Sequence, residues 1–165
     1  MTTTAESLAE AIPGSVTAVA ADGITNVLVP ADGLVNAVRA LRDDLGFVRF
    51  IDLTCVDDPG EDERFELQYL LYSMDEHRWL RVKCRTADAV PSITPLMAGA
   101  NWYEREVYDL FGVRFEGHPK LTRLMMPDDW EGYPLRKDAP KFWEPVDFKV
   151  TRPVYGPPEG REGYA

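Results

Sequence analysis

The spacing of apolar residues predicts a chain in which helices and strands alternate. Apolar residues recur every three or four positions in 30–45, which is typical of a helix with one buried face. Apolar and polar residues alternate in 65–73 and 78–85, which is typical of strands with one buried face. The predicted elements are, in chain order, a helix over 6–12, strands over 16–20 and 24–29, a helix over 30–45, strands over 47–56, 65–73 and 78–85, a helical turn over 91–97 and a helix over 101–111.

Turn chemistry and strand composition predict how these elements assemble. Asp22-Gly23 separates the first two strands and suits a tight primed turn, so we expect a hairpin. Residues 47–56 begin with apolar residues on both faces, which predicts a strand in the centre of a sheet. That strand and the two after it are expected to pair antiparallel. The order α-β-β-α-β-β-β-α predicts a two-layer α+β fold, with helices packed on a single mixed or antiparallel sheet.

The helix predicted over 101–111 has clear start and stop signals. Asn101 as N-cap and Glu104 three residues later form a capping-box pattern. Gly112 suits the left-handed position that ends many helices. The apolar residues of this helix share one arc, so we expect that arc to be buried.

Charged residues lie on both sides of the apolar arc. Glu104 and Glu106 flank it, and we expect them to accept hydrogen bonds from arginines of the following loop. Arg105 and Asp109 point away from it and are expected to remain available to a partner. The candidate donors in the loop are Arg114, Arg123 and Arg136.

The composition changes after residue 117. Eight of the thirteen prolines fall between Pro119 and Pro158, interleaved with tryptophan, tyrosine and phenylalanine. Proline at this density prevents helices and central strands, so the segment must be extended or turned. Its aromatic side chains offset the entropy of ordering only if they lie against another surface. We therefore predict a domain over 1–116 and an extended segment over 117–165 that wraps a partner, with amide protection falling after about Phe115.

Composition limits the classes of function. The chain has 165 residues, 45% of them hydrophobic, which suffices for one core, and its net charge of −10 argues against nucleic acid as a partner. Cys55 and Cys84 are far apart, so this chain alone is not expected to hold an iron–sulfur cluster or zinc ribbon. The first residues lack the pattern of a secretion signal, and no apolar run approaches the ~20 residues of a membrane helix. We expect a protein that is soluble, or peripheral to a membrane through a partner.

Few residues are arranged as in known catalytic or metal sites. Glu104 and Glu106 are acid/base candidates, because carboxylates beside apolar groups can have raised pKa values, but charged triplets on helices are more often paired or solvated. His118 precedes Pro119, which favours an extended backbone, yet no second ligand stands at metal-binding spacing. His77 belongs to a predicted exposed turn. The chain has no Gly-x-Ser-x-Gly, Gly-x-Gly-x-x-Gly or P-loop pattern.

Two interpretations of the segment near Arg136 stay open. Arg136-Lys137-Asp138 can form an ion pair with another subunit or stand as a solvated turn. Aromatic residues of this kind are normally core residues, but Trp130, Phe142 and Trp143 lie outside any periodic segment, and we interpret them as interface anchors.

Four short motifs follow one another between residues 104 and 138. They are Glu-Arg-Glu with Asp-Leu-Phe-Gly (104–112), Gly-His-Pro (117–119), Trp-Glu-Gly (130–132) and Pro-Leu-Arg-Lys-Asp (134–138). In this order they closely resemble the 30 kDa subunit family of respiratory complex I, whose bacterial members are the C-type subunits of the proton-pumping NADH:quinone oxidoreductase. The chain departs from the family pattern at Thr122, Tyr133 and Ala139. The resemblance marks as family-motif or partner-interface residues Glu104, Arg105, Glu106, Asp109, Phe111, Gly112, Gly117, His118, Pro119, Arg123, Trp130, Glu131, Gly132, Pro134, Leu135, Arg136, Lys137 and Asp138.

The resemblance implies a non-catalytic structural subunit of the peripheral arm. It implies docking on the 49 kDa-type (D-type) subunit near the quinone site, on the cytoplasmic side of the bacterial inner membrane, with only indirect membrane association. It also implies that FMN, iron–sulfur clusters and quinone belong to neighbouring subunits, and that this chain binds no cofactor or metal.

Three alternatives to this interpretation remain. The first is the equivalent subunit of a membrane-bound hydrogenase or other complex I-like complex. The second is a small stand-alone enzyme that uses Glu104, Glu106 and His118 for acid/base chemistry. The third is a free adaptor that binds several proteins through its C-terminal segment.

Overall fold

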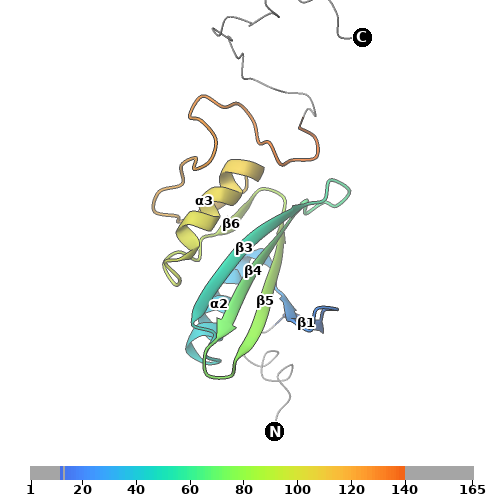
Figure 1. Ribbon diagram of the computed structural model, residues 1–165. Helices are drawn as coiled ribbons and strands as arrows, with labels where there is room; N and C mark the ends of the chain where they lie inside the picture. Colours follow the sequence, from blue (N-terminus) through green and yellow to red (C-terminus); the bar gives the residue numbers. More distant parts are fainter. Residues whose placement is uncertain (1–11, 13, 140–165) are drawn as a thin grey trace, which may run out of the picture.

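A mixed five-stranded sheet forms the body of the molecule, and the computed structural model describes residue 12 and residues 14–139 (Figure 1). β2 pairs with β5 in parallel and the other neighbours are antiparallel. The predicted α+β class is therefore confirmed. The strands are β1 (Val16–Val19), β2 (Thr25–Leu28), β3 (Arg49–Asp57), β4 (Phe65–Ser73) and β5 (Arg78–Thr86), in the spatial order β1-β2-β5-β4-β3.

Within the described residues, two helices and a short 3₁₀ turn accompany the sheet. The 3₁₀ turn η1 (Ala31–Gly33) leads into α2 (Leu34–Asp43), which agrees with the helix predicted over 30–45. The second helix, α3 (Ala100–Phe111), starts one residue before the predicted position. The helix predicted over 6–12 and the segment 140–165 lie outside the described residues.

A second, two-stranded sheet flanks α3. β6 (Ala89–Pro91) pairs in parallel with β7 (Arg114–Glu116), so α3 is the crossover between them. The predicted helical turn over 91–97 is present as a single turn, because the N–H groups of Leu96 and Met97 both donate to the carbonyl of Ile93. The sequence did not predict β6 or β7, because a strand of three residues has no measurable period.

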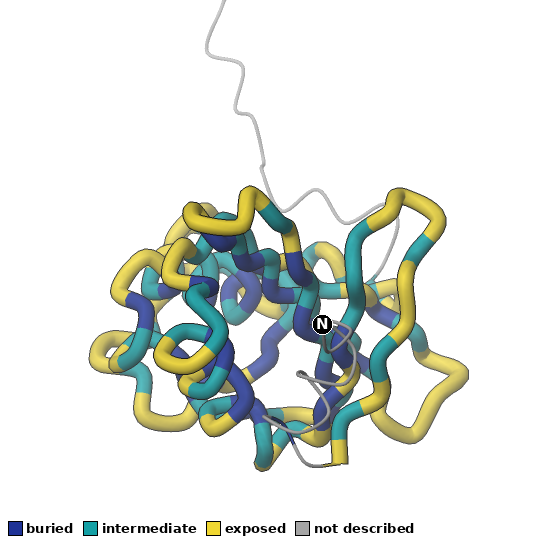
Figure 2. Tube along the Cα trace, turned by 90° about the horizontal axis from the view of Figure 1, so that it is seen from below, coloured by how far each residue is buried: buried dark blue, intermediate teal, exposed yellow. Residues whose placement is uncertain are grey.

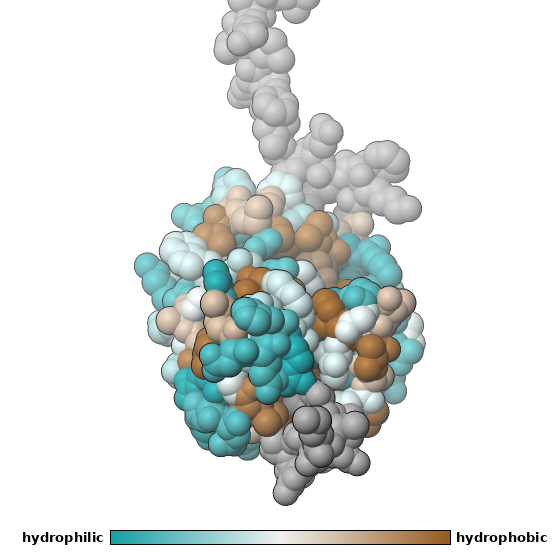
Figure 3. Space-filling model, turned by 60° about the horizontal axis from the view of Figure 1, so that its bottom comes forward, coloured by the Kyte–Doolittle hydropathy of each residue, from teal (hydrophilic) through white to brown (hydrophobic). Residues whose placement is uncertain are grey.

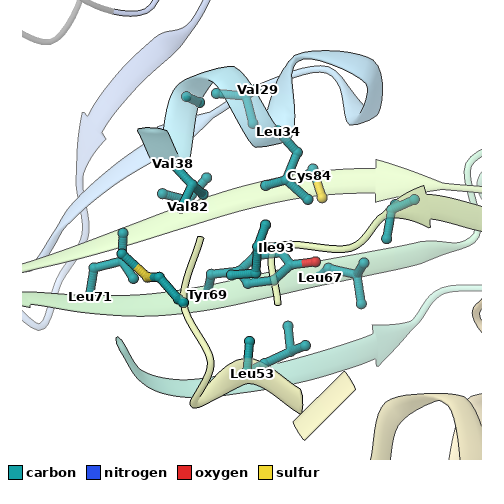
Figure 4. Close-up of a cluster of buried hydrophobic side chains, with 14 of the residues drawn as sticks. Val29, Leu34, Val38, Leu53, Leu67, Tyr69, Leu71, Val82, Cys84 and Ile93 are labelled. Carbon is teal, nitrogen blue, oxygen red and sulfur yellow. The ribbon is translucent and has the colours of Figure 1, made fainter. Parts of the chain in front are cut away.

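The core lies on one face of the large sheet. Every second residue of β4 is buried, from Phe65 to Ser73, and the same alternation continues in β5. Figure 4 shows Leu34 and Val38 of α2 meeting side chains of β4 and β5, with Ile93 from the connection after β6 among them. Buried positions are concentrated inside the molecule and exposed ones in its outer loops (Figure 2).

Two predictions about the sheet were wrong. The strand predicted in the centre of the sheet, β3, lies at its edge. Its early apolar residues are covered by a helix instead of a further strand, since the ring of Phe50 meets that of Tyr103 on α3 edge-on, at 5.3 Å between centroids. The first hairpin is present, but its turn is not primed, since Gly23 alone has a positive φ there, of 79°.

Candidate functional site around helix α3

A glycine stands at each end of helix α3. Gly99 is the N-cap and makes no side-chain hydrogen bond, so the predicted capping box of Asn101 with Glu104 is wrong. Gly112 ends the helix as predicted, with φ of 81° and its N–H donating to the carbonyl of Tyr108. The motif residues that follow Gly112 fold back onto this helix.

Glu104 is buried in the first half of α3 and binds the connection after β6. Its Oε1 accepts the N–H of Ile93 at 2.8 Å, and its Oε2 accepts the hydroxyls of Ser92 at 2.6 Å and Thr94 at 3.0 Å. Burial raises the pKa of Glu104 above its ordinary value, and these three donors offset that only in part. Arginines of the following loop were expected to donate to Glu104. That prediction was wrong, because its donors are two hydroxyls and an amide.

His118 lies beside Glu104 with its side chain buried. Its Nδ1 accepts the N–H of Lys120 at 3.0 Å, and its Nε2 lies 3.2 Å from the carbonyl oxygen of Asn101 and 4.0 Å from Oε2 of Glu104. Because Nδ1 accepts a hydrogen bond, Nε2 is the ring nitrogen that donates to the carbonyl of Asn101. Both ring nitrogens are therefore occupied by the chain's own backbone.

Asp109 is buried in the second half of α3 and binds four donors of the following loop. Its Oδ1 accepts Nη1 of Arg123 at 2.7 Å. Its Oδ2 accepts the N–H groups of Leu124, Met125 and Met126, at 2.9, 2.7 and 2.9 Å. Burial works to raise the pKa of Asp109, but these amides and Arg123 together outweigh it, so the pKa is lowered. Asp109 was expected to be available to a partner, and it is not.

Arg105 also binds the loop rather than standing free. Its Nε donates to the carbonyl of Thr122 at 3.0 Å and its Nη2 to that of Arg123 at 2.9 Å. Its guanidinium lies 4.9 Å from the ring centroid of Trp102. The prediction of an available Arg105 was therefore wrong as well.

The C-terminal end of α3 is covered by Tyr133 and Arg136. Arg136 donates through Nε to the carbonyl of Phe111, and its guanidinium lies 4.5 Å from the ring centroid of Tyr133. A Cβ at Gly112 would lie 2.5 Å from both Nη2 of Arg136 and Cε2 of Tyr133. Only glycine fits at this point, for its positive φ and for the space.

The end of the described segment is bound to β3. Nη1 and Nη2 of Arg64 lie 2.8 and 2.9 Å from the carboxylate of Asp138, and Nη2 also lies 2.7 Å from Oδ2 of Asp57. The N–H of Lys137 donates to the same Asp57 oxygen at 2.6 Å. Arg64 lowers the pKa of Asp57. Asp138 therefore has an ion-pair partner within its own chain.

The structure thus gathers some of the motif residues and leaves others at the surface. Trp130 and Pro134 are half-buried, as is Glu106 on α3. Gly117 and Gly132 adopt positive φ angles of 81° and 83°. Exposed motif residues are Gly117, Pro119, Glu131, Gly132, Leu135, Lys137 and Asp138, and the residues bound around α3 are Glu104, Arg105, Asp109, Phe111, Gly112, His118, Arg123 and Arg136.

Metal-ligating side chains do not cluster in the part of the chain that the structure describes. Within it, no group of three or more His, Cys, Asp or Glu residues is placed to hold a metal ion. Cys55 and Cys84 both lie opposite Leu67, on the two strands that flank β4. Burial raises the pKa of both thiols to about 12. Among the described helices, none has the length and apolar content to cross a bilayer.

Comparison with known proteins identifies the family. The family model "Respiratory-chain NADH dehydrogenase, 30 Kd subunit" matches residues 27–142. The C-type NADH-quinone oxidoreductase subunit of Methylobacterium sp. (strain 4-46) is 46% identical over 139 residues, which cover 81% of this chain and 64% of that protein. The corresponding C-type subunit of Rhizobium meliloti (strain 1021) is 42% identical over 86% of this chain and 74% of its own length.

Two further similarities concern larger assemblies. A protein of Methylococcus capsulatus whose name combines the C and D subunits of NADH-quinone oxidoreductase is 42% identical over 73% of this chain and 22% of its own length. A chain in the structure of the membrane-bound sulfane sulfur reductase, an archaeal respiratory membrane complex, superposes with a TM-score of 0.71. It is 33% identical, and the match covers 79% of this chain and 80% of that one.

These matches define a class of α+β subunits rather than a fold alone. The chain belongs to the 30 kDa subunit family of respiratory-chain NADH dehydrogenase. The resemblance seen in the motifs is thereby confirmed.

Proposed function

We propose that this chain is the C-type subunit of a complex I-type NADH-quinone oxidoreductase and that it supplies structure rather than chemistry. The family match over residues 27–142 carries this proposal, because it includes most of the sheet, α3 and the motif segment. Relatives at 42–46% identity bear the name of that subunit. α3 packs on β3 of the sheet, where Phe50 meets Tyr103, and α3 in turn holds the motif segment.

The geometry favours a non-catalytic role. Glu104 and His118 have buried side chains, and their polar atoms are bound to neighbouring groups of the same chain. A general acid or base must reach the proton that it transfers, and these two groups have no exposed surface through which to do so. In this proposal FMN, the iron–sulfur clusters and the quinone belong to neighbouring subunits.

The partner in this proposal is the 49 kDa-type (D-type) subunit, together with other subunits of the peripheral arm. The relative whose name combines the C and D subunits supports this choice, because fusion keeps two domains at high effective concentration, as suits domains that function in contact. We place the contact near the quinone site, on the cytoplasmic side of the bacterial inner membrane. The exposed motif residues, among them Glu131, Leu135 and Lys137, belong to it.

Purification of the intact assembly tests this proposal. A tag on the chromosomal copy of the chain should recover, from detergent-solubilised membranes, one stoichiometric complex that contains the 49 kDa-type subunit and oxidises NADH with a quinone. Native mass spectrometry of that complex gives its subunits. Several soluble partners without a membrane complex would instead identify an adaptor. Substrate turnover by the isolated chain, lost in His118→Ala, would identify a stand-alone enzyme.

A complex I-like assembly with another electron donor is the second candidate. The similarity to a chain of the membrane-bound sulfane sulfur reductase complex favours it, since that chain has the same fold and is 33% identical. Both candidates give the chain the same structural role. The donor that the purified complex oxidises, NADH or another such as dihydrogen, separates them.

A further inference from the structure

Trp102 of α3 and the neighbouring residues Leu124 and Met125, in the loop that Asp109 binds, have exposed apolar side chains. Trp102 is 58% exposed, Met125 62% and Leu124 36%. We call them the Trp102–Met125 face. Arg105 connects its parts, because it lies over the ring of Trp102 and binds the carbonyl of Arg123, the residue before Leu124. Figure 1 shows the segment after β7 passing beside α3.

Asp109 holds this face in place. Its Oδ2 binds the N–H groups of Leu124 and Met125, and its Oδ1 binds the guanidinium of Arg123. The three groups point inward to a buried carboxylate, while the side chains of Leu124 and Met125 stay exposed. The loop is therefore ordered before any partner arrives, which removes much of the entropic cost of binding.

Acidic residues follow Leu124 and Met125 closely along the chain. Asp128, Asp129 and Glu131 are exposed and make no ion pair with the residues that the structure describes. Arg123 does not neutralise them, because it is bound to Asp109. An apolar centre with a charged rim is the usual arrangement of a protein interface. The complementary surface has an apolar pocket with lysine or arginine at its border.

We propose that the Trp102–Met125 face docks into an apolar pocket with a basic rim on a neighbouring subunit of the same complex. This inference rests on the proposed function and adds the surface and the chemistry of the partner to it. A second copy of the chain fits less well, because it would bring two acidic segments together in a chain of net charge −10. Anionic lipid is disfavoured for the same reason.

Met74 provides a matched control for Met125. It is 47% exposed and follows β4 at the turn into β5, at the end of the sheet away from residues 117–139. The surface at that end is mainly polar, with apolar groups scattered over it (Figure 3). Met125→Asp and Met74→Asp place the same charge at an exposed methionine, so both variants should melt close to the wild-type temperature.

The test uses the whole complex in membranes. Met125→Asp should lower the amount of chain recovered in the complex roughly tenfold, as expected for an interface hot spot, whereas Met74→Asp should not change it. A photoreactive phenylalanine analogue at position 125 should cross-link to another subunit, and one at position 74 should not. Asp128→Lys with Asp129→Lys should weaken recovery most at low salt.

Any result that differs from these expectations overturns the inference. If the chain is recovered in the complex, but Met125→Asp matches Met74→Asp and position 125 gives no cross-link, the face is wrong and the proposed function stands. A cross-link between two copies of the chain would show a dimer in place of the neighbouring subunit. If the wild-type chain is found in no such complex, both the face and the proposed function fail.

Discussion

Two buried carboxylates on one helix have opposite electrostatic surroundings. Glu104 meets two hydroxyls and one amide of residues 92–94, and its pKa is raised by burial. Asp109 meets a guanidinium and three amides of residues 123–126, and its pKa is lowered although burial opposes this. The first carboxylate binds the connection from β6. The second binds a loop with no secondary structure of its own.

The comparison shows how an irregular segment can be folded. Residues 117–139 contain turns and bends but no helix or strand, so no strand partner orders them. One ionised carboxylate with four donors takes the place of a strand partner, because hydrogen bonds to charged groups are stronger than those between neutral groups. The region around Glu104 needs no ionised group, since two sheets and a helix already fix it.

Removal of the Asp109 carboxylate should have the largest effect. Asp109→Ala leaves Arg123 and three amides without their acceptor, and we expect the free energy of unfolding to fall by roughly 3 kcal/mol. Urea unfolding of the isolated chain measures this loss. Asp129→Ala, which removes an exposed carboxylate without an ion pair in the described residues, is the control and should change little. Equal stability of the two variants would contradict the anchoring role.

Removal of the Glu104 carboxylate should cost less. Glu104→Ala leaves the amide of Ile93 without an acceptor inside the protein, while the hydroxyls of Ser92 and Thr94 can rotate. We expect a loss of about 2 kcal/mol in the free energy of unfolding. Hydrogen exchange at residues 124–126 should stay slow in this variant. Fast exchange there would mean that the two carboxylates act as one unit.

Substitution of Gly112 tests the second contact of the loop. Gly112 and Gly117 both have φ of 81°, but only at Gly112 would a Cβ meet Tyr133 and Arg136. Gly117→Ala should lower the free energy of unfolding by about 1 kcal/mol, because of the backbone strain alone. Gly112→Ala should lower it by about 1 kcal/mol more, because its Cβ also meets neighbouring side chains. Thermal unfolding of the two variants gives the difference. Equal costs would show that Tyr133 and Arg136 do not press on the helix end in solution.

The dependence of stability on pH should separate the two carboxylates most finely. Asp109 has a lowered pKa, so its contribution is present above its unfolded pKa of about 4 and is lost as pH falls through the folded pKa. Glu104 has a raised pKa, so its contribution is present below its unfolded pKa of about 4 and is lost as pH rises through the folded pKa.

Urea midpoints between pH 3 and 7 measure this dependence. The stability deficit of Asp109→Asn should shrink as the pH is lowered toward the folded pKa of Asp109. The stability deficit of Glu104→Gln should instead shrink as the pH is raised toward the folded pKa of Glu104. Two variants with parallel profiles would contradict the assigned directions.

Elements with a clear period were predictable from the sequence, and contacts between distant segments were not. The alternation in β4 and the helical repeat in α2 gave both elements at nearly the correct bounds. The position of β3 at the edge was missed, because apolar residues on both faces do not reveal whether a strand or a helix covers them.

The site was predictable in its residues more than in its contacts. A loop arginine does bind a carboxylate of α3, but Arg123 binds Asp109 and not Glu104. A helical projection shows which side chains flank the apolar arc, and it cannot show which of them the returning chain will cover. The aromatic rings of this segment were expected to lie on the surface of a partner. The ring of Tyr133 instead packs on this chain's own Tyr108, with 6.4 Å between the ring centroids.

Hydrogen exchange at Leu124, Met125 and Met126 tests most directly whether Asp109 folds this loop before any partner binds. The expectation of little protection after Phe115 is replaced by one of slow exchange at these three amides in the isolated chain. Exchange should stay slow in Glu104→Gln and become fast in Asp109→Asn, which exchanges an acceptor oxygen for a donor. Fast exchange at these amides in the wild-type chain, or no difference between the two variants, would contradict the account.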